Sequence, residues 1–158
     1  ILEGITGERP RGYRSPSWEL SDQSLSLLAD RGFVYDSSLM GDDAPYLVDA
    51  GVGRDLVEVP VHWSLDDAPF YPFNPAVSRT EVMASPHAVY ETWASAFDEI
   101  YERGRAYTLT MHPWVTGRAG RLSMLERLIR YIAAFDHVEF ARTIDVAEGY
   151  RERTAAAG

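Results

Sequence analysis

The stretch "RGYRSPSWELSDQSLSLLADRGFVYDSS" (residues 11–38) decides the fold class, because it places a helix between two extended segments. Ser21 is a typical N-cap residue and Gly32 is a typical glycine after a helix C-terminus, so together they predict a helix over residues 22–31. The apolar run that follows predicts a short strand ending on Asp36. An extended loop, a helix and a strand in this order are typical of an α/β protein.

Beyond this stretch, predicted strands and helices continue to alternate. The expected strands cover residues 55–63, 106–112 and 138–141, the expected helices cover 86–103, 120–135 and 143–156, and loops cover 40–55 and 64–81. The alternation predicts an α/β fold with a mostly parallel sheet. A barrel is favoured over an open doubly wound sheet because no GxGxxG turn or P-loop follows a strand. The chain supplies about five strands, fewer than the roughly seven or eight of a closed barrel.

The composition excludes several classes of protein. With 158 residues the chain is about one domain long, and its net charge of −9 argues against nucleic acid or an anionic membrane as a partner. No run of residues is long and apolar enough to span a bilayer. The chain has no cysteine, which excludes disulfides and zinc–thiolate sites and is compatible with the cytoplasmic location that we expect.

Polar side chains stand at the C-terminal ends of the predicted strands. They are Arg14, Asp36, His62 and His112. In a parallel β/α barrel this edge collects the active-site residues, because the loops converge there. We therefore expect a functional site at this edge.

His112 is the strongest catalytic candidate. It ends an apolar strand, and Pro113 and Trp114 follow it. The proline fixes the backbone, the tryptophan can form one wall of a pocket, and an imidazole suits proton transfer to a leaving group near neutral pH. The alternative is a structural histidine that caps the loop.

Arg14, with Pro16 and Trp18 close behind it, is the second candidate. A guanidinium at the edge of a core can hold a carboxylate through two parallel hydrogen bonds and keep it ionised. The alternative is a surface salt bridge.

Acidic and aromatic residues form a third group of candidates. Asp66 and Asp67 follow Trp63, and either carboxylate within reach of His112 could orient its ring. The alternative is a solvated acidic loop. Tyr46 lies in a turn that can also form a substrate rim.

Two further expectations concern assembly and metal binding. Phe70, Tyr71 and Phe73 can form a hydrophobic lid or an oligomer contact, and we favour the contact and hence a homo-oligomer. The histidines are dispersed, with no HxxxH or HExxH pair, so no metal site is expected from the residues of this chain.

Four segments in this order resemble the polysaccharide deacetylase family: "GYRSPSW", "FVYDSS", "EVPVHWSLDD" and "LTMHPWVTGR". The resemblance covers residues 4–148 and is nearest to the intracellular branch of peptidoglycan-deacetylase-like and cyclic-imide-hydrolase-like members. It implies the C-terminal part of a distorted (β/α)7-type barrel, the NodB-like fold. It also implies a hydrolase of non-peptide C–N bonds acting on a small-molecule or oligosaccharide substrate.

The resemblance further implies a role for each candidate residue. In such enzymes a divalent metal, often zinc, binds the attacking water and an aspartate acts as base. Arg14 matches the arginine that orients this aspartate, and His112 matches the general acid. The implied groove is lined by Trp18, Trp63 and Trp114, with Asp66 or Asp67 as the partner of His112 and Tyr46 at the rim.

The family's N-terminal motifs, which carry the base and the metal ligands, do not occur in this sequence. We therefore expect residues 1–158 to be the C-terminal half of a single catalytic domain, inactive by themselves, with the metal ligands in the missing N-terminal part. Two alternatives stay open: a cyclic imide or amide hydrolase of the same fold, and a non-catalytic binding or scaffold protein that has lost the metal site.

Overall fold

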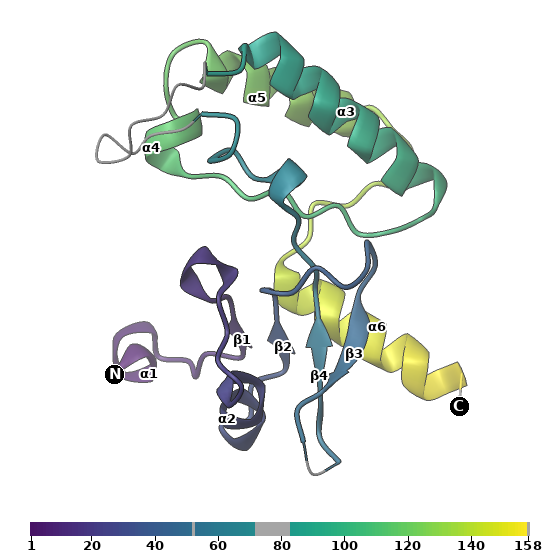
Figure 1. The fold of residues 1–158 in the computed structure, drawn as a ribbon. Helices are drawn as coiled ribbons and strands as arrows, with labels where there is room; N and C mark the ends of the chain where they lie inside the picture. Colours follow the sequence, from purple (N-terminus) through teal and green to yellow (C-terminus); the bar gives the residue numbers. More distant parts are fainter. Residues whose placement is uncertain (52, 72–82, 158) are drawn as a thin grey trace. The chain divides into compact units, whose positions relative to one another are not determined.

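The computed structural model describes residues 1–51, 53–71 and 83–157 (Figure 1). The chain divides into two compact units, which we call the sheet unit (Ile1–Val61 with Phe140–Gly158) and the helical unit (His62–Glu139). The predicted single catalytic domain stays a prediction. None of the helices in the described residues is long and apolar enough to cross a membrane.

The described residues of the sheet unit form four strands. Its elements are α1 (Leu2–Thr6), β1 (Gly12–Tyr13), the 3₁₀ turn η1 (Pro16–Trp18), α2 (Ser24–Asp30), β2 (Tyr35–Asp36), β3 (Tyr46–Asp49), β4 (Asp55–Glu58) and α6 (Thr143–Ala157). The strand order is β1-β2-β4-β3, with β1–β2 and β2–β4 parallel and β3–β4 antiparallel. The α/β class is thereby confirmed, and the sheet is open.

Strand β4 presents an apolar side chain to each of its faces, as expected for a strand that is covered on two sides. Leu56 packs with Leu28 of α2, and Val57, the next residue, packs with Ala147 of α6. Successive side chains of a strand point to opposite faces, so α2 and α6 cover opposite faces of the sheet (Figure 1).

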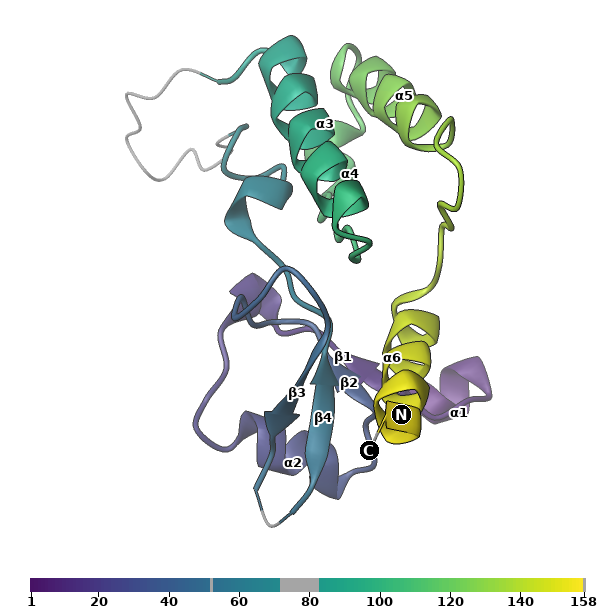
Figure 2. The same ribbon diagram turned by 90° about the vertical axis from the view of Figure 1, so that its right-hand side faces the viewer.

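The helical unit packs two long helices around an aromatic core. Its elements are η2 (Trp63–Leu65), α3 (Pro86–Glu102), α4 (Pro113–Thr116) and α5 (Arg121–Ile132). Helices α3 and α5 lie side by side (Figure 2), and Trp93, Phe97 and Leu128 fill the space between them and the neighbouring loops. Trp93 is fully buried and donates from Nε1 to the carbonyl of Ser64 at 3.0 Å.

Helix α3 begins and ends where its sequence signals predict. The Ser85 hydroxyl accepts a hydrogen bond from the amide of Ala88 at 3.1 Å, Pro86 occupies the first helical position, and Gly104 follows the helix with φ +61°. The predicted cap of α2 is wrong. Gln23 precedes that helix, while Ser21 forms a turn in which its carbonyl accepts from the amide of Ser24.

The predicted loop 40–55 contains a strand. Gly51 and Gly53 adopt φ values of +89° and +69°, which lets the chain reverse and pair β3 with β4. The glycines were visible in the sequence, but a short strand with half-buried residues gave no clear alternation. Helices α1 and α4 were not predicted either.

Two predicted strands are absent from the described residues. Residues 106–112 form one isolated parallel bridge, between Thr110 and Asp66, and 138–141 form no strand. Tyr107, Leu109 and Val138 pack instead against the aromatic core of the helical unit. Their apolar character therefore reflects packing on α3 and α5 rather than membership of a sheet.

The predicted oligomer contact is wrong for Tyr71, whose side chain is buried in the core of the helical unit. Phe70 is half-buried and packs edge-on against Trp93. Phe73 lies outside the described residues.

Replacement of Trp93 by alanine tests the core assignment. Because Trp93 is fully buried and hydrogen-bonded, Trp93→Ala should lower the free energy of unfolding by about 3–5 kcal/mol in denaturant titrations. The matched control is Trp63→Ala, an exposed tryptophan, which should change it by less than about 0.5 kcal/mol. Equal losses in the two variants would contradict this packing.

Candidate functional site

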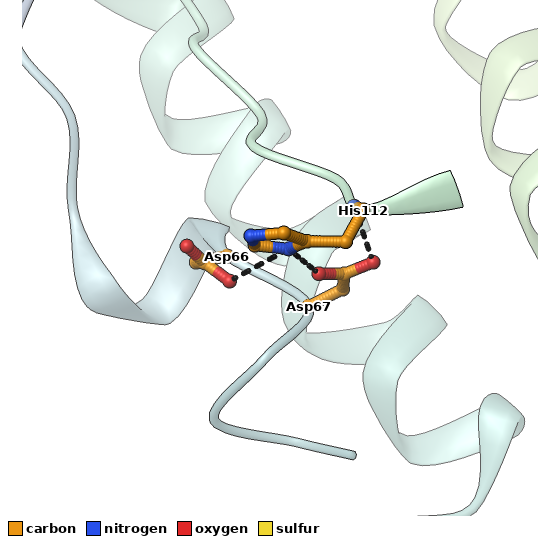
Figure 3. A group of neighbouring side chains, drawn as sticks. All are labelled: Asp66, Asp67 and His112. Carbon is orange, nitrogen blue, oxygen red and sulfur yellow. Dashed lines mark hydrogen bonds and ion pairs between the residues drawn. The ribbon is translucent and has the colours of Figure 1, made fainter. Parts of the chain in front are cut away.

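The helical unit brings Asp66, Asp67 and His112 together (Figure 3). Asp67 Oδ1 lies 2.6 Å from His112 Nδ1, and Asp67 Oδ2 accepts a hydrogen bond from the backbone amide of His112 at 2.9 Å. Thr116 Oγ1 donates to the same Oδ2 at 2.5 Å. One carboxylate therefore holds both the ring and the backbone of His112.

Backbone bonds between two distant segments create this arrangement. The amide of Thr110 donates to the carbonyl of Leu65 at 2.8 Å, and the amide of Asp67 donates to the carbonyl of Thr110 at 3.2 Å. Pro113 occupies the first position of α4, so that short helix begins directly after His112. Its first turn carries Thr116 back toward Asp67.

The hydrogen bonds define the state of the His112 ring. The Asp67 side chain is 0 % exposed and three donors surround it, as a buried carboxylate requires. Because an ionised carboxylate can only accept, Nδ1 of His112 carries the proton of the shared bond. The second ring nitrogen, Nε2, points away from Asp67 (Figure 3), and the His112 side chain is 32 % exposed. Nε2 is therefore the atom available for proton exchange.

Asp66 plays a different part from Asp67. Its Oδ1 lies 3.9 Å from His112 Nδ1, beyond hydrogen-bond distance, and accepts from the amide of Ala68 at 2.6 Å. The sequence left open which aspartate is the partner of His112, and the geometry favours Asp67. Asp66 adds negative charge beside the ring.

An exposed tryptophan, Trp114, lies two residues after His112 in the sequence and beside it in space. The rings of His112 and Trp114 have centroids 5.2 Å apart at an angle of 56°. Trp114 is 57 % exposed and Trp63 is 48 % exposed. Large exposed indole surfaces are suited to binding a ligand.

Arg14 belongs to the sheet unit, where it follows β1. Its Nε donates to the carbonyl of Ser37 at 3.0 Å and its NH2 donates to Ser37 Oγ at 2.7 Å. Ser37 Oγ donates in turn to the carbonyl of Val59 at 2.6 Å. Two bonds from one guanidinium edge fix the plane of the group.

The turn after Arg14 is strained. Ser17 and Trp18 have φ values of +55° and +59°, a region that residues with a Cβ adopt at a cost. Trp18 is half-buried. Strained turns concentrate at functional sites, and this one follows the predicted arginine directly.

Tyr46, the predicted rim residue, begins β3. Its hydroxyl accepts a hydrogen bond from the amide of Gly41 at 3.3 Å. Burial is the largest cause that raises the pKa of Tyr46 above its ordinary value, and the charge that Glu58 carries at alkaline pH adds to it, so the phenol stays neutral in the physiological range. The substrate-binding roles of the tryptophans, Tyr46 and the two aspartates stay predictions.

One group of described residues could offer ligands to a metal ion: Asp66, Asp67 and His112. One possible ligand atom of each lies within 4.8 Å of those of the other two. Most of their ligand atoms already make hydrogen bonds, however. Nδ1 of His112 donates to Asp67 Oδ1, Asp67 Oδ2 accepts from the amide of His112 and from Thr116, and Asp66 Oδ1 accepts from a backbone amide. A cation held by all three residues would have to displace the bonds of Asp67, so this arrangement does not fit a three-ligand metal site.

Sequence reasoning missed several residues that support the candidates. Thr116 gave no signal, since a threonine at the end of a short helix is common. Ser37 and Ser38 follow the predicted strand directly, and Glu58 is a charge inside the apolar run "DLVEVPV". A buried charge within such a run was the available signal for Glu58.

Comparison with known proteins gives a consistent set of relatives. The chain is 31% identical over 97% of its length to a peptidoglycan deacetylase of Helicobacter pylori, and 26% identical over 95% to a peptidoglycan deacetylase-like protein of Gibberella zeae. These matches cover 61% and 54% of the two relatives, so the chain spans little more than half of their length. No protein-family model matches the sequence.

Two solved structures are similar over nearly the whole chain. One, from Mycobacterium smegmatis and assigned to the polysaccharide deacetylases, has a TM-score of 0.88 and 39% identity, covering 97% of this chain and 53% of that one. The other, a probable polysaccharide deacetylase of Pseudomonas aeruginosa, has a TM-score of 0.81 and 27% identity, covering 96% and 49%.

A substitution at Asp67 tests the state of the histidine ring. In Asp67→Asn the two donors at the Oδ2 position require the amide oxygen, which turns the NH₂ group toward Nδ1. The Nδ1-bound proton of His112 should then lose its hydrogen-bonded signal in ¹⁵N-resolved NMR spectra. Asp66→Asn is the matched control and should keep that signal, because Asp66 makes no hydrogen bond to the ring. The assignment fails if Asp67→Asn keeps the signal while the variant remains folded.

Proposed function

We propose that this chain, which belongs to the polysaccharide deacetylase family, carries the general acid and the orienting arginine of a metal-dependent enzyme that removes acetyl groups from N-acetylated sugars. The observation that carries the proposal is the buried Asp67 carboxylate on Nδ1 of His112. The names of the relatives support the substrate class.

His112 acts on the leaving group in this proposal. An amide nitrogen leaves poorly as an anion, so it must gain a proton when the tetrahedral intermediate collapses. Protonated His112 donates its Nε2 proton to that nitrogen, the C–N bond breaks, and the products are an amine and acetate. Asp67 stays ionised and holds the imidazolium in place through Nδ1.

Arg14 is assigned the orienting role. Ser37 fixes the plane of its guanidinium through two hydrogen bonds, and a fixed planar fork suits a carboxylate. We propose that it orients a catalytic aspartate outside these 158 residues. That aspartate is the base that takes a proton from the attacking water.

The divalent metal that the family implies is assigned to residues outside this chain, since Asp66, Asp67 and His112 do not fit it. Zinc remains the proposed ion. The open sheet is assigned to the C-terminal part of a (β/α)7-type barrel, and Trp18, Trp63 and Trp114 are each assigned to substrate binding. The cytoplasmic location and the homo-oligomer stay predictions.

Replacing His112 tests the general acid. His112→Gln should lower turnover on an N-acetylated sugar by on the order of 10²–10⁴, the range typical of a positioned proton donor. An activated ester substrate should lose far less, because its leaving group needs no proton. His87→Gln, on the exposed face of α3, is the matched control and should keep full turnover.

Equal losses on the ester and the amide would mean that His112 only holds its loop in place. That outcome would overturn the assigned role while leaving the Asp67 contact intact.

Metal content tests the assignment of the ligands. Since no metal ligand is assigned to this group, Asp66→Asn and His112→Gln should keep the wild-type content of zinc or another divalent ion by elemental analysis of the dialysed protein. Loss of the ion in both variants would place it on these residues and overturn the assignment.

A further inference from the structure

Two fully buried acidic side chains lie next to each other in the sheet unit. Asp36 ends β2 and Glu58 ends β4, and the two residues are partners in the register of the parallel strands. Both are 0 % exposed. Two buried carboxylates on adjacent strands repel each other strongly unless a proton lies between them.

The hydrogen bonds around the pair lack one donor. Asp36 accepts at both oxygens from Ser38, from its amide at 3.0 Å and from its hydroxyl at 3.1 Å. Glu58 Oε1 accepts from the amide of Leu39 at 2.9 Å, but Glu58 Oε2 is buried and has no donor among the described residues. A carboxyl proton on Oε2 would convert this oxygen into the donor of a bond to Asp36.

The electrostatic balance assigns the proton to Glu58. The pKa of Glu58 is raised to about 8. Burial is the largest cause, the hydrogen bond from the Leu39 amide acts against it, and the charge of Asp36 and a hydrogen bond between the two side chains add to the rise. Burial also raises the pKa of Asp36, but bonds from Glu58 and Ser38 act in the opposite direction. Glu58 is therefore the neutral member at pH 7 and Asp36 the anion.

We propose that Asp36 and Glu58 share one proton, and that this protonated pair positions Arg14. The shared proton and the positioning of Arg14 are inferred from the sheet unit alone, while the catalytic role of Arg14 rests on the proposed function.

A short chain of hydrogen bonds joins the pair to the arginine loop. Ser38 Oγ donates to Asp36 Oδ1 and accepts from the amide of Ser15 at 2.9 Å, so Asp36 fixes the residue that follows Arg14. Ser37, the residue after Asp36, binds the guanidinium itself. The segment that Asp36 anchors thus holds Arg14 at both its backbone and its side chain.

Loss of the shared proton would place two negative charges inside the sheet. The other ionisable groups to consider are Tyr46 of β3, which pairs with Glu58, Asp42, which acts on Tyr46, and Arg14, which binds Ser37. Neither the neutral Tyr46 nor the acidic Asp42 can compensate a second negative charge, and the Arg14 guanidinium is held by Ser37 rather than by the pair. Repulsion should then loosen Asp36, Ser38 and the loop that holds Arg14.

The test compares the pH dependence of stability in the wild-type protein and in Glu58→Gln. The glutamine amide has one donor group and one acceptor oxygen, as a protonated glutamate has, but it does not titrate. The pKa of Glu58 is raised in the folded state, so between about pH 4.5 and about pH 8 the native state holds a proton that the unfolded state has released. The free energy of unfolding must therefore fall as the pH rises through this window. Relative to Glu58→Gln, wild-type stability should fall over this window with a slope of about one proton. Glu152→Gln, an exposed matched control in α6, should keep the wild-type slope.

Hydrogen exchange of the Ser15 amide reads out the position of the arginine loop without any substrate. After correction for intrinsic exchange, its protection should fall in the wild type between about pH 6 and pH 9 and stay constant in Glu58→Gln. In wild-type protein at pH 7, an infrared band of a protonated carboxyl group gives the same test of the proton without a variant.

Each outcome decides one part of the proposal. Identical pH slopes in wild type and Glu58→Gln, or no protonated carboxyl band at pH 7, would overturn the shared proton. A shared proton with equal Ser15 protection at all pH values would overturn the positioning of Arg14. Absence of deacetylase activity would contradict the proposed function, but it would not affect the results on the shared proton or on Ser15 protection.

Discussion

The hydrogen bond between Asp67 Oδ1 and His112 Nδ1 is the contact on which the candidate site depends. It joins two segments that are 45 residues apart, fixes which ring nitrogen carries the proton and leaves Nε2 pointing away from the carboxylate. The buried Asp67 charge would be costly without its three donors, so Thr116 and the backbone of His112 are part of the same arrangement. Changing any of these groups changes the state of the histidine.

The sheet unit also holds buried carboxylates that need hydrogen-bond donors, at the ends of its parallel strands. Register places Tyr13, Asp36 and Glu58 beside one another, and Arg14 and Ser37 follow directly. An ordinary core would be apolar there. Instead, the unit keeps two buried acids and a chain of serines, and a shared proton explains how it does so.

How far the sequence could predict this structure depended on whether the signal was local. Caps and amphipathic periodicity are local, so α3, α5 and α6 were predicted nearly at their bounds. Apolar runs are ambiguous. Residues 106–112 read as a strand because burial on α3 and burial in a sheet select the same side chains. Strand β3 was missed because its partner is set by the glycine turn and not by its own pattern.

The candidate site followed the same rule. Arg14 follows strand β1 as predicted, whereas the segment before His112 forms a single bridge and not the predicted strand, and the roles of both residues stay predictions. The choice of Asp67 over Asp66 required the distances from each carboxylate to His112, since the sequence does not show which of two adjacent side chains points toward the ring. Glu58 was missed because its partner, Asp36, lies on another strand and only the register joins them.

The most direct test of the central claim is a product measurement. The protein that carries this chain, loaded with its divalent ion, is incubated with an N-acetylated oligosaccharide and, separately, with a cyclic imide. Free acetate and free amine are then quantified. We expect acetate and amine in equal amounts from the oligosaccharide. Opening of the imide ring with no acetate from the sugar would contradict it, as would no product from either substrate.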